Sequence, residues 1–155
     1  MARYATELTA AVDPTTAFEY LARFSSTEEW DPGVVEASMV SDEPVGMGSR
    51  FLVVTEQGGR KLPLTYEIVE FDPPHRVALL AESSRIRSFD TITITPARSD
   101  AADAGCRVRY DADLQVKGPL RWVADPVLHL LFKRIGDRAA TGLAAALDRL
   151  AAPGA

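Results

Sequence analysis

The chain has 155 residues, of which 46% are hydrophobic and 25% charged, and its formal net charge at pH 7 is −5. This length and balance are typical of one globular domain with its own core, and the acidic charge argues against a nucleic-acid-binding protein, which needs a basic face. The single cysteine, Cys106, has no partner for an internal disulfide, which excludes a secreted, disulfide-stapled fold.

The chain shows no sign of a membrane or export signal. No stretch approaches the roughly 20 apolar residues that a membrane-spanning helix needs. Residues 1–7 contain no apolar segment of the signal-peptide kind. These features predict a cytoplasmic protein without a membrane span, and we expect a monomer or a homodimer.

The first 30 residues predict a strand followed by two short helices. Residues 3–12 alternate between apolar and polar positions, which is typical of a strand. Asp13 and Pro14 then form the N-cap and first residue of a helix that reaches about Phe24. A second short helix ends at Trp30, just before an Asp-Pro-Gly turn.

From residue 34 to residue 116 the hydrophobic pattern becomes that of strands. The predicted strands are residues 34–40, 50–56, 61–71, 76–82, 87–95 and 106–116. The last of these alternates most clearly, with apolar residues on one side and Arg, Asp, Gln and Lys on the other. An antiparallel sheet with one covered face follows from this pattern.

The last third of the chain predicts a long amphipathic helix. Asp125 and Pro126 resemble a second N-cap and first helical residue, so we favour a short segment over residues 119–124 and a main helix after it. A single helix from Pro119, kinked at Pro126, is the alternative.

Residue size divides the apolar face of this helix into two halves. At roughly 100° per residue, the bulky side chains lie in the N-terminal half and the small residues Ala139, Gly142 and Ala146 in the C-terminal half. We expect the small residues to let the helix approach the sheet closely. The bulkier half would stand further away and help to enclose a cavity.

Several motifs, in their order along the chain, resemble those of a known superfamily. They are Asp13-Pro14 after the first strand, Trp30-Asp31-Pro32, VGMGSRF at residues 45–51, EIVEFDPP at residues 67–74, and LQVKGPL at residues 114–120. The chain is similar to the helix-grip superfamily, which includes START-related lipid-transfer domains, birch-pollen-allergen-like proteins and bacterial polyketide cyclase/dehydrase-like proteins.

The resemblance implies an α+β helix-grip fold for a single domain over residues 1–152. Its parts would be a curved antiparallel sheet of about seven strands, two short helices after the first strand, and a long C-terminal helix across the concave face. The superfamily contains binders, carriers and enzymes on one scaffold, so the fold alone does not define the function.

Common catalytic and cofactor motifs have little support. Gly46 and Gly48 precede a strand and lack a third glycine, so they predict a turn and not a nucleotide site. The histidines, His75 and His129, and Cys106 have no ligand spacing, so we expect no metal. No nucleophile elbow is present, and we expect no cofactor.

Four residues are candidates for acid–base chemistry. Tyr66 and Tyr110 lie on the apolar sides of their strands, and their hydroxyl groups need hydrogen-bond partners, either structural or from a ligand. Asp90 would point inward with Arg87 or Arg85 as its partner, or outward if a bulge forms at the preceding residue. His129 flanks the apolar helix face, where a surface or boundary role is favoured.

The expected function is binding or transport of a hydrophobic small molecule, such as a lipid, polyketide or isoprenoid-like compound, in an internal cavity. The alternatives are a polyketide cyclase/dehydratase-type enzyme that uses the same cavity, and a protein-interaction module that uses the alternating charges of residues 107–113. The predicted ligand-binding residues are Trp30, Phe51, Leu64, Tyr66, Leu79, Tyr110, Leu114, Leu128, Leu131, Phe132 and Ile135.

Overall fold

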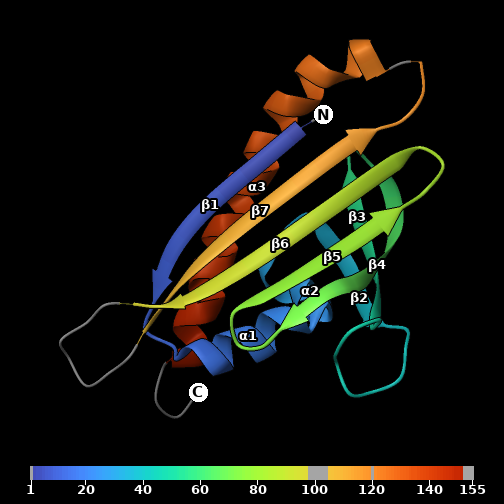
Figure 1. The fold of residues 1–155 in the computed structure, drawn as a ribbon. Coiled ribbons are helices and arrows are strands. Elements are labelled where there is room, and N and C mark those ends of the chain that lie inside the picture. The colour runs from blue at the N-terminus through green and yellow to red at the C-terminus, as the bar shows by residue number, and fades with distance from the viewer. Residues whose placement is uncertain (1, 98–104, 120, 152–155) are drawn as a thin grey trace.

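The computed structural model describes residues 2–97, 105–119 and 121–151, and for residues 121–129 it describes the backbone only. Within these residues the chain forms seven strands and four helical segments (Figure 1). In chain order they are β1 (Ala2–Ala10), α1 (Pro14–Ala22), the 3-10 turn η1 (Phe24–Ser26), α2 (Thr27–Trp30), β2 (Val34–Met39), β3 (Arg50–Gln57), β4 (Arg60–Asp72), β5 (Arg76–Glu82), β6 (Ile86–Pro96), β7 (Cys106–Val116) and α3 (Arg121–Ala151).

The strands form one antiparallel sheet in the order β1-β7-β6-β5-β4-β3-β2. Consecutive strands are neighbours except that β1 pairs with β7, which places the first and last strands side by side. The sheet curls, and α3 crosses its concave side (Figure 1). The predicted helix-grip architecture, with two short α-helices after the first strand, is confirmed, and the 3-10 turn η1 joins these two helices.

The start of α1 has the predicted cap. The Asp13 carboxylate accepts hydrogen bonds from the Thr16 backbone N–H at 3.0 Å and from the Thr16 hydroxyl at 2.6 Å, and Pro14 occupies the first helical turn. The cap satisfies a backbone donor that has no partner inside the helix. The buried face of α1 then packs into the main core cluster through Phe18 and Leu21.

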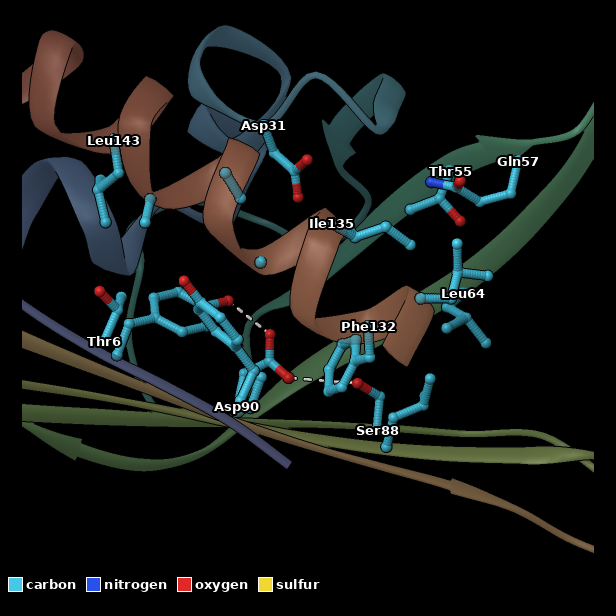
Figure 2. A pocket seen from close by; sticks show the side chains of 18 of the residues that line it. Thr6, Asp31, Thr55, Gln57, Leu64, Ser88, Asp90, Phe132, Ile135 and Leu143 are labelled. Atoms are coloured by element: carbon cyan, nitrogen blue, oxygen red, sulfur yellow. Dashed lines mark hydrogen bonds between the residues drawn. The ribbon is translucent and has the colours of Figure 1, made fainter. Parts of the chain in front are cut away.

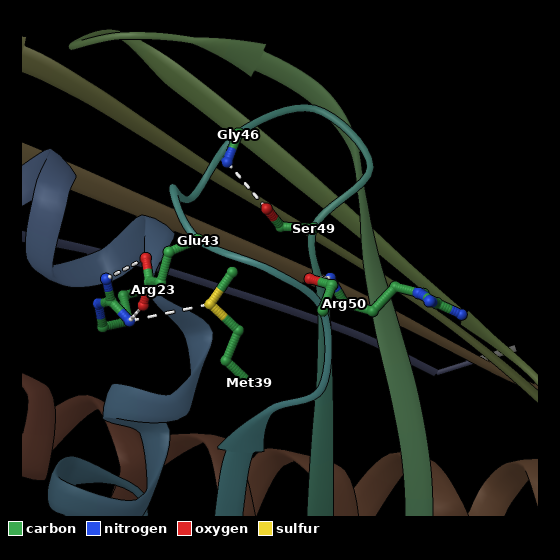
Figure 3. Close-up of polar contacts among 7 residues, drawn as sticks. Arg23, Met39, Glu43, Gly46, Ser49 and Arg50 are labelled. Carbon is green, nitrogen blue, oxygen red and sulfur yellow. Dashed lines mark hydrogen bonds and ion pairs between the residues drawn. The ribbon is translucent and has the colours of Figure 1, made fainter.

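Polar contacts tie the loop between β2 and β3 to the end of α1 (Figure 3). Arg23 donates two hydrogen bonds to the Glu43 carboxylate, at 2.6 and 2.9 Å. In the same loop the Gly46 N–H donates to the Ser49 hydroxyl at 2.9 Å. These contacts hold the turn that the glycine-containing motif predicts.

The predicted break in the C-terminal helix is wrong. Helix α3 runs from Arg121 to Ala151 without interruption and includes Pro126. A proline inside a helix loses one hydrogen bond and costs about 3 kcal/mol, but its fixed φ of about −65° is itself helical. The chain therefore continues through Pro126, so the alternative with a single helix agrees better with the structure.

Small residues bring α3 close to two different elements. A Cβ atom on Gly142 would overlap the backbone carbonyl oxygen of Trp30 in α2, and one on Gly136 would lie 2.5 Å from the Tyr4 ring in β1. At Gly142 the close neighbour of α3 is therefore the backbone of α2 and not a strand of the sheet. A close approach to the sheet is at Gly136, within the bulkier half.

None of the helices among the described residues is long and apolar enough to cross a membrane.

Candidate functional site

A cavity of about 360 Å³ lies between α3 and the concave face of the sheet. This volume is at the lower end of the range for small-molecule sites, roughly 300–1,000 Å³. Leu62 in β4 and Leu131 in α3 line it and remain 39% and 43% exposed, so the cavity opens to solvent beside them. Its other apolar lining residues are Leu64, Ile86, Ala112, Leu114, Phe132, Ile135, Ala139, Ala140 and Leu143.

A chain of polar side chains crosses the cavity floor. Tyr66 in β4 donates to the Ser88 hydroxyl at 3.0 Å, and Ser88 donates to one Asp90 carboxylate oxygen at 3.2 Å. The Tyr110 hydroxyl donates to the other Asp90 oxygen at 2.5 Å. Figure 2 shows Asp90 and Ser88 on the sheet below the helix, with dashed lines along the contacts of the Asp90 carboxylate. We call Tyr66, Ser88, Asp90 and Tyr110 the floor cluster.

Strand register brings the floor cluster together. Ser88 and Asp90 are two residues apart in β6 and therefore share one face of the sheet. The β6–β7 register is continuous and places Asp90 opposite Ala112, one inward position from Tyr110. The inward orientation of Asp90 is confirmed, with the side chain only 7% exposed, and no bulge lies at Phe89.

The predicted arginine partner for Asp90 is wrong. Its partners are the hydroxyl groups of Ser88 and Tyr110. Arg87 lies three residues before Asp90 on the opposite face of β6, where its guanidinium lies 5.8 Å from the centre of the Phe89 ring. Successive residues of a strand face opposite sides, so Arg87 does not share a face with Asp90, and Arg85 lies in the turn before β6.

Burial controls the electrostatics of the cavity. Desolvation raises the pKa of Asp90 to about 6, although the hydrogen bonds from Tyr110 and Ser88 oppose the change. Desolvation also raises the pKa of Asp31, while the Gly33 N–H, 2.8 Å from its carboxylate, lowers it. Burial and the nearby Asp90 charge raise the pKa of both tyrosines. The cavity therefore contains two carboxyl groups whose charged forms are disfavoured.

Aromatic rings pack around the floor cluster. Trp30 is only 5% exposed and meets the Tyr110 ring edge-to-face at 5.9 Å. Phe24 from η1 packs on Tyr66 at 4.9 Å. The Trp30 indole N–H is buried and has no hydrogen-bond partner among the described residues, although buried tryptophans usually find one.

Most of the predicted ligand-binding residues line this cavity. Those that do are Trp30, Leu64, Tyr66, Tyr110, Leu114, Leu131, Phe132 and Ile135. Phe51 and Leu79 do not line it, so for them the prediction is wrong: both are fully buried in the core cluster. Strand alternation only predicts that a side chain faces the concave side of the sheet. On that side, η1 packs against β3, and core side chains separate Phe51 and Leu79 from the cavity. The side chains of Leu128 and His129 lie outside the described residues.

Sequence reasoning missed Ser88 and Asp31. Two-residue spacing from Asp90 could have placed Ser88 on the cavity floor, since both belong to one predicted strand. Asp31 lies in the turn after α2, where no periodicity applies, and its side chain points toward the cavity (Figure 2). Thr6, Thr55 and Gln57 also line the cavity.

Two other regions carry less support as sites. A hollow of about 470 Å³ lies beside α1, and its lining includes Arg23, which is already paired with Glu43. The alternating charges of β7 lie in ion pairs: Arg107 with Glu7, Arg109 with Asp111, and Asp113 with Arg3. Among the residues the structure describes, no group of three or more His, Cys, Asp or Glu side chains could hold a metal ion.

The curled sheet, the long helix across it and the cavity between them define a helix-grip protein. A family model described as "Polyketide cyclase / dehydrase and lipid transport" matches residues 1–148. The chain therefore belongs to this family.

Solved structures share the fold at low sequence identity. A START superfamily protein from Mycobacterium smegmatis has a TM-score of 0.77 and 14% identity, covering 97% of this chain and 99% of that one. A protein from Thermus thermophilus has a TM-score of 0.76 and 16% identity, covering 94% and 96%. The di-domain ARO/CYC protein BexL of the BE-7585A biosynthetic pathway has a TM-score of 0.63 and 17% identity, covering 96% of this chain and 46% of BexL. A search of curated proteins found no match.

Proposed function

We propose that the protein binds or carries an apolar small molecule, such as a lipid, polyketide or isoprenoid-like compound, in the cavity under α3. The observation that supports this most is the cavity itself, about 360 Å³ with walls made mainly of Leu, Ile, Phe and Ala. Burial of apolar ligand surface against such walls contributes roughly 25 cal/mol per Å². The floor cluster would orient the polar end of the ligand.

Filling the cavity should abolish binding. Ala112 lines the cavity floor in β7, so Ala112→Phe places a ring in the space that the ligand needs. We expect wild-type protein to bind the neutral fluorophore N-phenyl-1-naphthylamine saturably. The variant should bind at least about tenfold more weakly, a change of about 1.4 kcal/mol. Fluorescence titration measures both affinities.

Gln115→Phe is the matched control, because Gln115 is exposed and lies on the opposite side of the same strand. Its affinity should stay within about twofold of wild type. Native mass spectrometry of freshly purified protein should also show a co-purifying apolar compound. If wild type neither binds the fluorophore saturably nor carries a small molecule, the binding function is wrong.

A second function, a polyketide cyclase or dehydratase, is supported by one observation. Asp90 is a buried acid whose pKa is raised to about 6 and whose carboxylate contacts the Tyr110 hydroxyl. A pKa near the working pH suits general acid–base catalysis. Asp90 would take a proton from a carbon between two carbonyls. That carbon would attack a third carbonyl of the same chain, and the proton held by Asp90 would pass to the new alkoxide to give an alcohol. Asp90 would then take the second proton from that carbon and return it to the hydroxyl group, which leaves as water while a carbon–carbon double bond forms.

A short synthetic poly-β-ketone thioester tests this second function. Wild type should accelerate cyclisation with loss of one water, followed by mass spectrometry. Asp90→Asn should slow the reaction at least about 100-fold, as expected for loss of general acid–base catalysis, while the substrate still binds. Equal rates with wild type, with Asp90→Asn and without protein would leave only the binding function.

A further inference from the structure

The floor cluster presents hydrogen-bond acceptors to the cavity. Tyr66 donates to Ser88, and Ser88 and Tyr110 both donate to Asp90. Each hydroxyl proton is thus already used inside the cluster, since a hydroxyl group has one proton to donate. The lone pairs of the tyrosine oxygens and of the Asp90 carboxylate remain for a ligand. An acceptor-rich floor is complementary to a ligand that donates.

The charged groups of the cavity also favour a ligand that donates, because they are acids. Asp31 and Asp90 both line it, and of the lining residues whose side chains the structure describes none is Arg, Lys or His. The ion pairs among the described residues lie on the surface and include neither acid. Among the described residues, the Asp31 carboxylate accepts one hydrogen bond, from the Gly33 N–H. A buried carboxylate is costly unless a cation pairs with it, so an anionic ligand would be repelled here and a cationic one stabilised.

The arrangement of apolar and polar groups suits a molecule with one charged end. Figure 2 places Asp31 above the floor, on the turn after α2, with Asp90 below it on the sheet. The rings of Trp30 and Tyr110 stand beside this end of the cavity, and aromatic faces attract cations. Leu64, Phe132 and Leu131 supply apolar wall on the side of the mouth, where Thr55 and Gln57 add two uncharged polar groups beside Leu62.

We propose that the cavity selects an apolar molecule that ends in a protonated amine, with the ammonium held between Asp90 and Asp31 and the tail directed toward Leu131. This inference rests on the proposed binding function, since it names the class of ligand for the same cavity. The ammonium donates up to three hydrogen bonds to the carboxylate and phenol oxygens, and its charge compensates the two acids. Ligands that end in a carboxylate or phosphate would be rejected.

Three probes with one tail test the proposal: decylamine, decanol and sodium decanoate, each competing with N-phenyl-1-naphthylamine near neutral pH. Decylamine should displace the fluorophore at concentrations at least about tenfold lower than decanol, and decanoate should be the weakest, by about 100-fold or more relative to the amine. This ranking in the wild-type protein requires no variant. Equal affinity for the amine and the alcohol, or a preference for decanoate, would overturn the inference and leave the binding function intact.

Variants identify the groups that hold the amine. Asp90→Asn should weaken decylamine at least about tenfold more than it weakens decanol, and Asp31→Asn should act in the same direction. Asp113→Asn removes one carboxylate from the outer face of β7, where Asp113 pairs with Arg3, and serves as the control for net charge. If Asp113→Asn lowers decylamine affinity as much as Asp90→Asn, the selection comes from overall charge and the proposed site is wrong. Failure of all three probes and of the fluorophore would instead contradict the binding function itself.

Discussion

Replacing Gly142 with alanine should destabilise the protein by about 2–3 kcal/mol, within the usual range for overpacking. A Cβ atom at this position would overlap the carbonyl oxygen of Trp30 and lie 2.9 Å from its carbonyl carbon. Both atoms belong to the backbone of α2, so no rotamer change can relieve the overlap. Helix α3 or α2 must move, and Trp30, which lines the cavity, moves with it. Urea denaturation followed by circular dichroism gives the free energy of unfolding.

The sign of this effect distinguishes packing from helix propensity. At an open helical position, alanine is about 1 kcal/mol more favourable than glycine. The reverse change Ala145→Gly, at an exposed position of the same helix, should therefore cost about 1 kcal/mol from propensity alone. Gly46→Ala, where no atom lies within 4 Å, should leave stability unchanged or slightly raised. A stabilising Gly142→Ala change would show that α3 does not contact Trp30 as described.

The second large effect is a pH-dependent gain in stability for Asp90→Asn. Burial raises the pKa of Asp90 from its ordinary 3.8 to about 6. Between these values the folded state binds the proton and the unfolded state does not, so stability falls as pH rises. Above about pH 6 the ionised Asp90 destabilises the fold by about 3 kcal/mol, since one pKa unit is worth about 1.4 kcal/mol. Asparagine has no such ionisation.

The measurement is the difference in free energy of unfolding between Asp90→Asn and wild type. This difference should move in favour of the variant by about 3 kcal/mol between about pH 4 and about pH 7.5. Surface acids such as Glu43 and Glu82, whose pKa their Arg or Lys partners lower, have the opposite pH dependence. They occur in both proteins, so their contribution cancels. A difference that stays constant with pH would contradict the raised pKa of Asp90.

Tyrosine variants provide an independent test of how the floor cluster sets the pKa of Asp90. Tyr110→Phe removes the hydroxyl group that donates to Asp90, a bond that lowers its pKa. The pKa of Asp90, followed by NMR of its carboxyl carbon, should rise by about one unit, because a hydrogen bond to a charged group contributes about 1.5–3 kcal/mol. Tyr66→Phe should shift it less, because the Tyr66 hydroxyl reaches Asp90 only through Ser88.

The cavity combines apolar walls with an acidic floor. This combination is the basis of the proposed binding function and of the proposed preference for an amine ligand. A purely apolar cavity would discriminate between ligands mainly by size and shape. The floor cluster and Asp31 add a charge and a hydrogen-bond pattern that a ligand must match. Raised pKa values often mark functional sites, although structural networks also perturb them. Ligand competition and the Asp90→Asn variant separate these two origins.

Local sequence patterns predicted the elements well. Two-residue alternation predicted the bounds of β5 and β7 as the structure has them, and the other strands to within two residues at each end. Asp13-Pro14 predicted the start of α1 together with its cap. These features depend on residues close together in the chain, such as the donors that a helix start leaves unpaired. They can therefore be predicted from the sequence without a tertiary structure.

Contacts between distant segments were predicted less well. The local sequence predicts Arg87 or Arg85 as the partner of Asp90, but its partners include Tyr110 from β7. Phe51 and Leu79 were placed in the cavity wall because they alternate onto the concave face, yet core packing encloses them. Pro126 predicted a break that the long helix does not make. For Asp90, Phe51 and Leu79, packing or pairing with distant segments decides the outcome.

Hydrophobic periodicity and turn residues are enough to predict the order of strands and helices and the side of each strand that faces inward, because both depend on neighbours in the chain. The floor cluster and its acidic surroundings exist only in the folded chain. Tyr66, Asp90 and Tyr110 come from three strands, and Asp31 comes from the turn after α2. The hydrogen bonds of the cluster, and the meeting of Asp90 and Asp31 in one cavity, depend on strand register and on where α3 crosses the sheet. Both are properties of the assembled core.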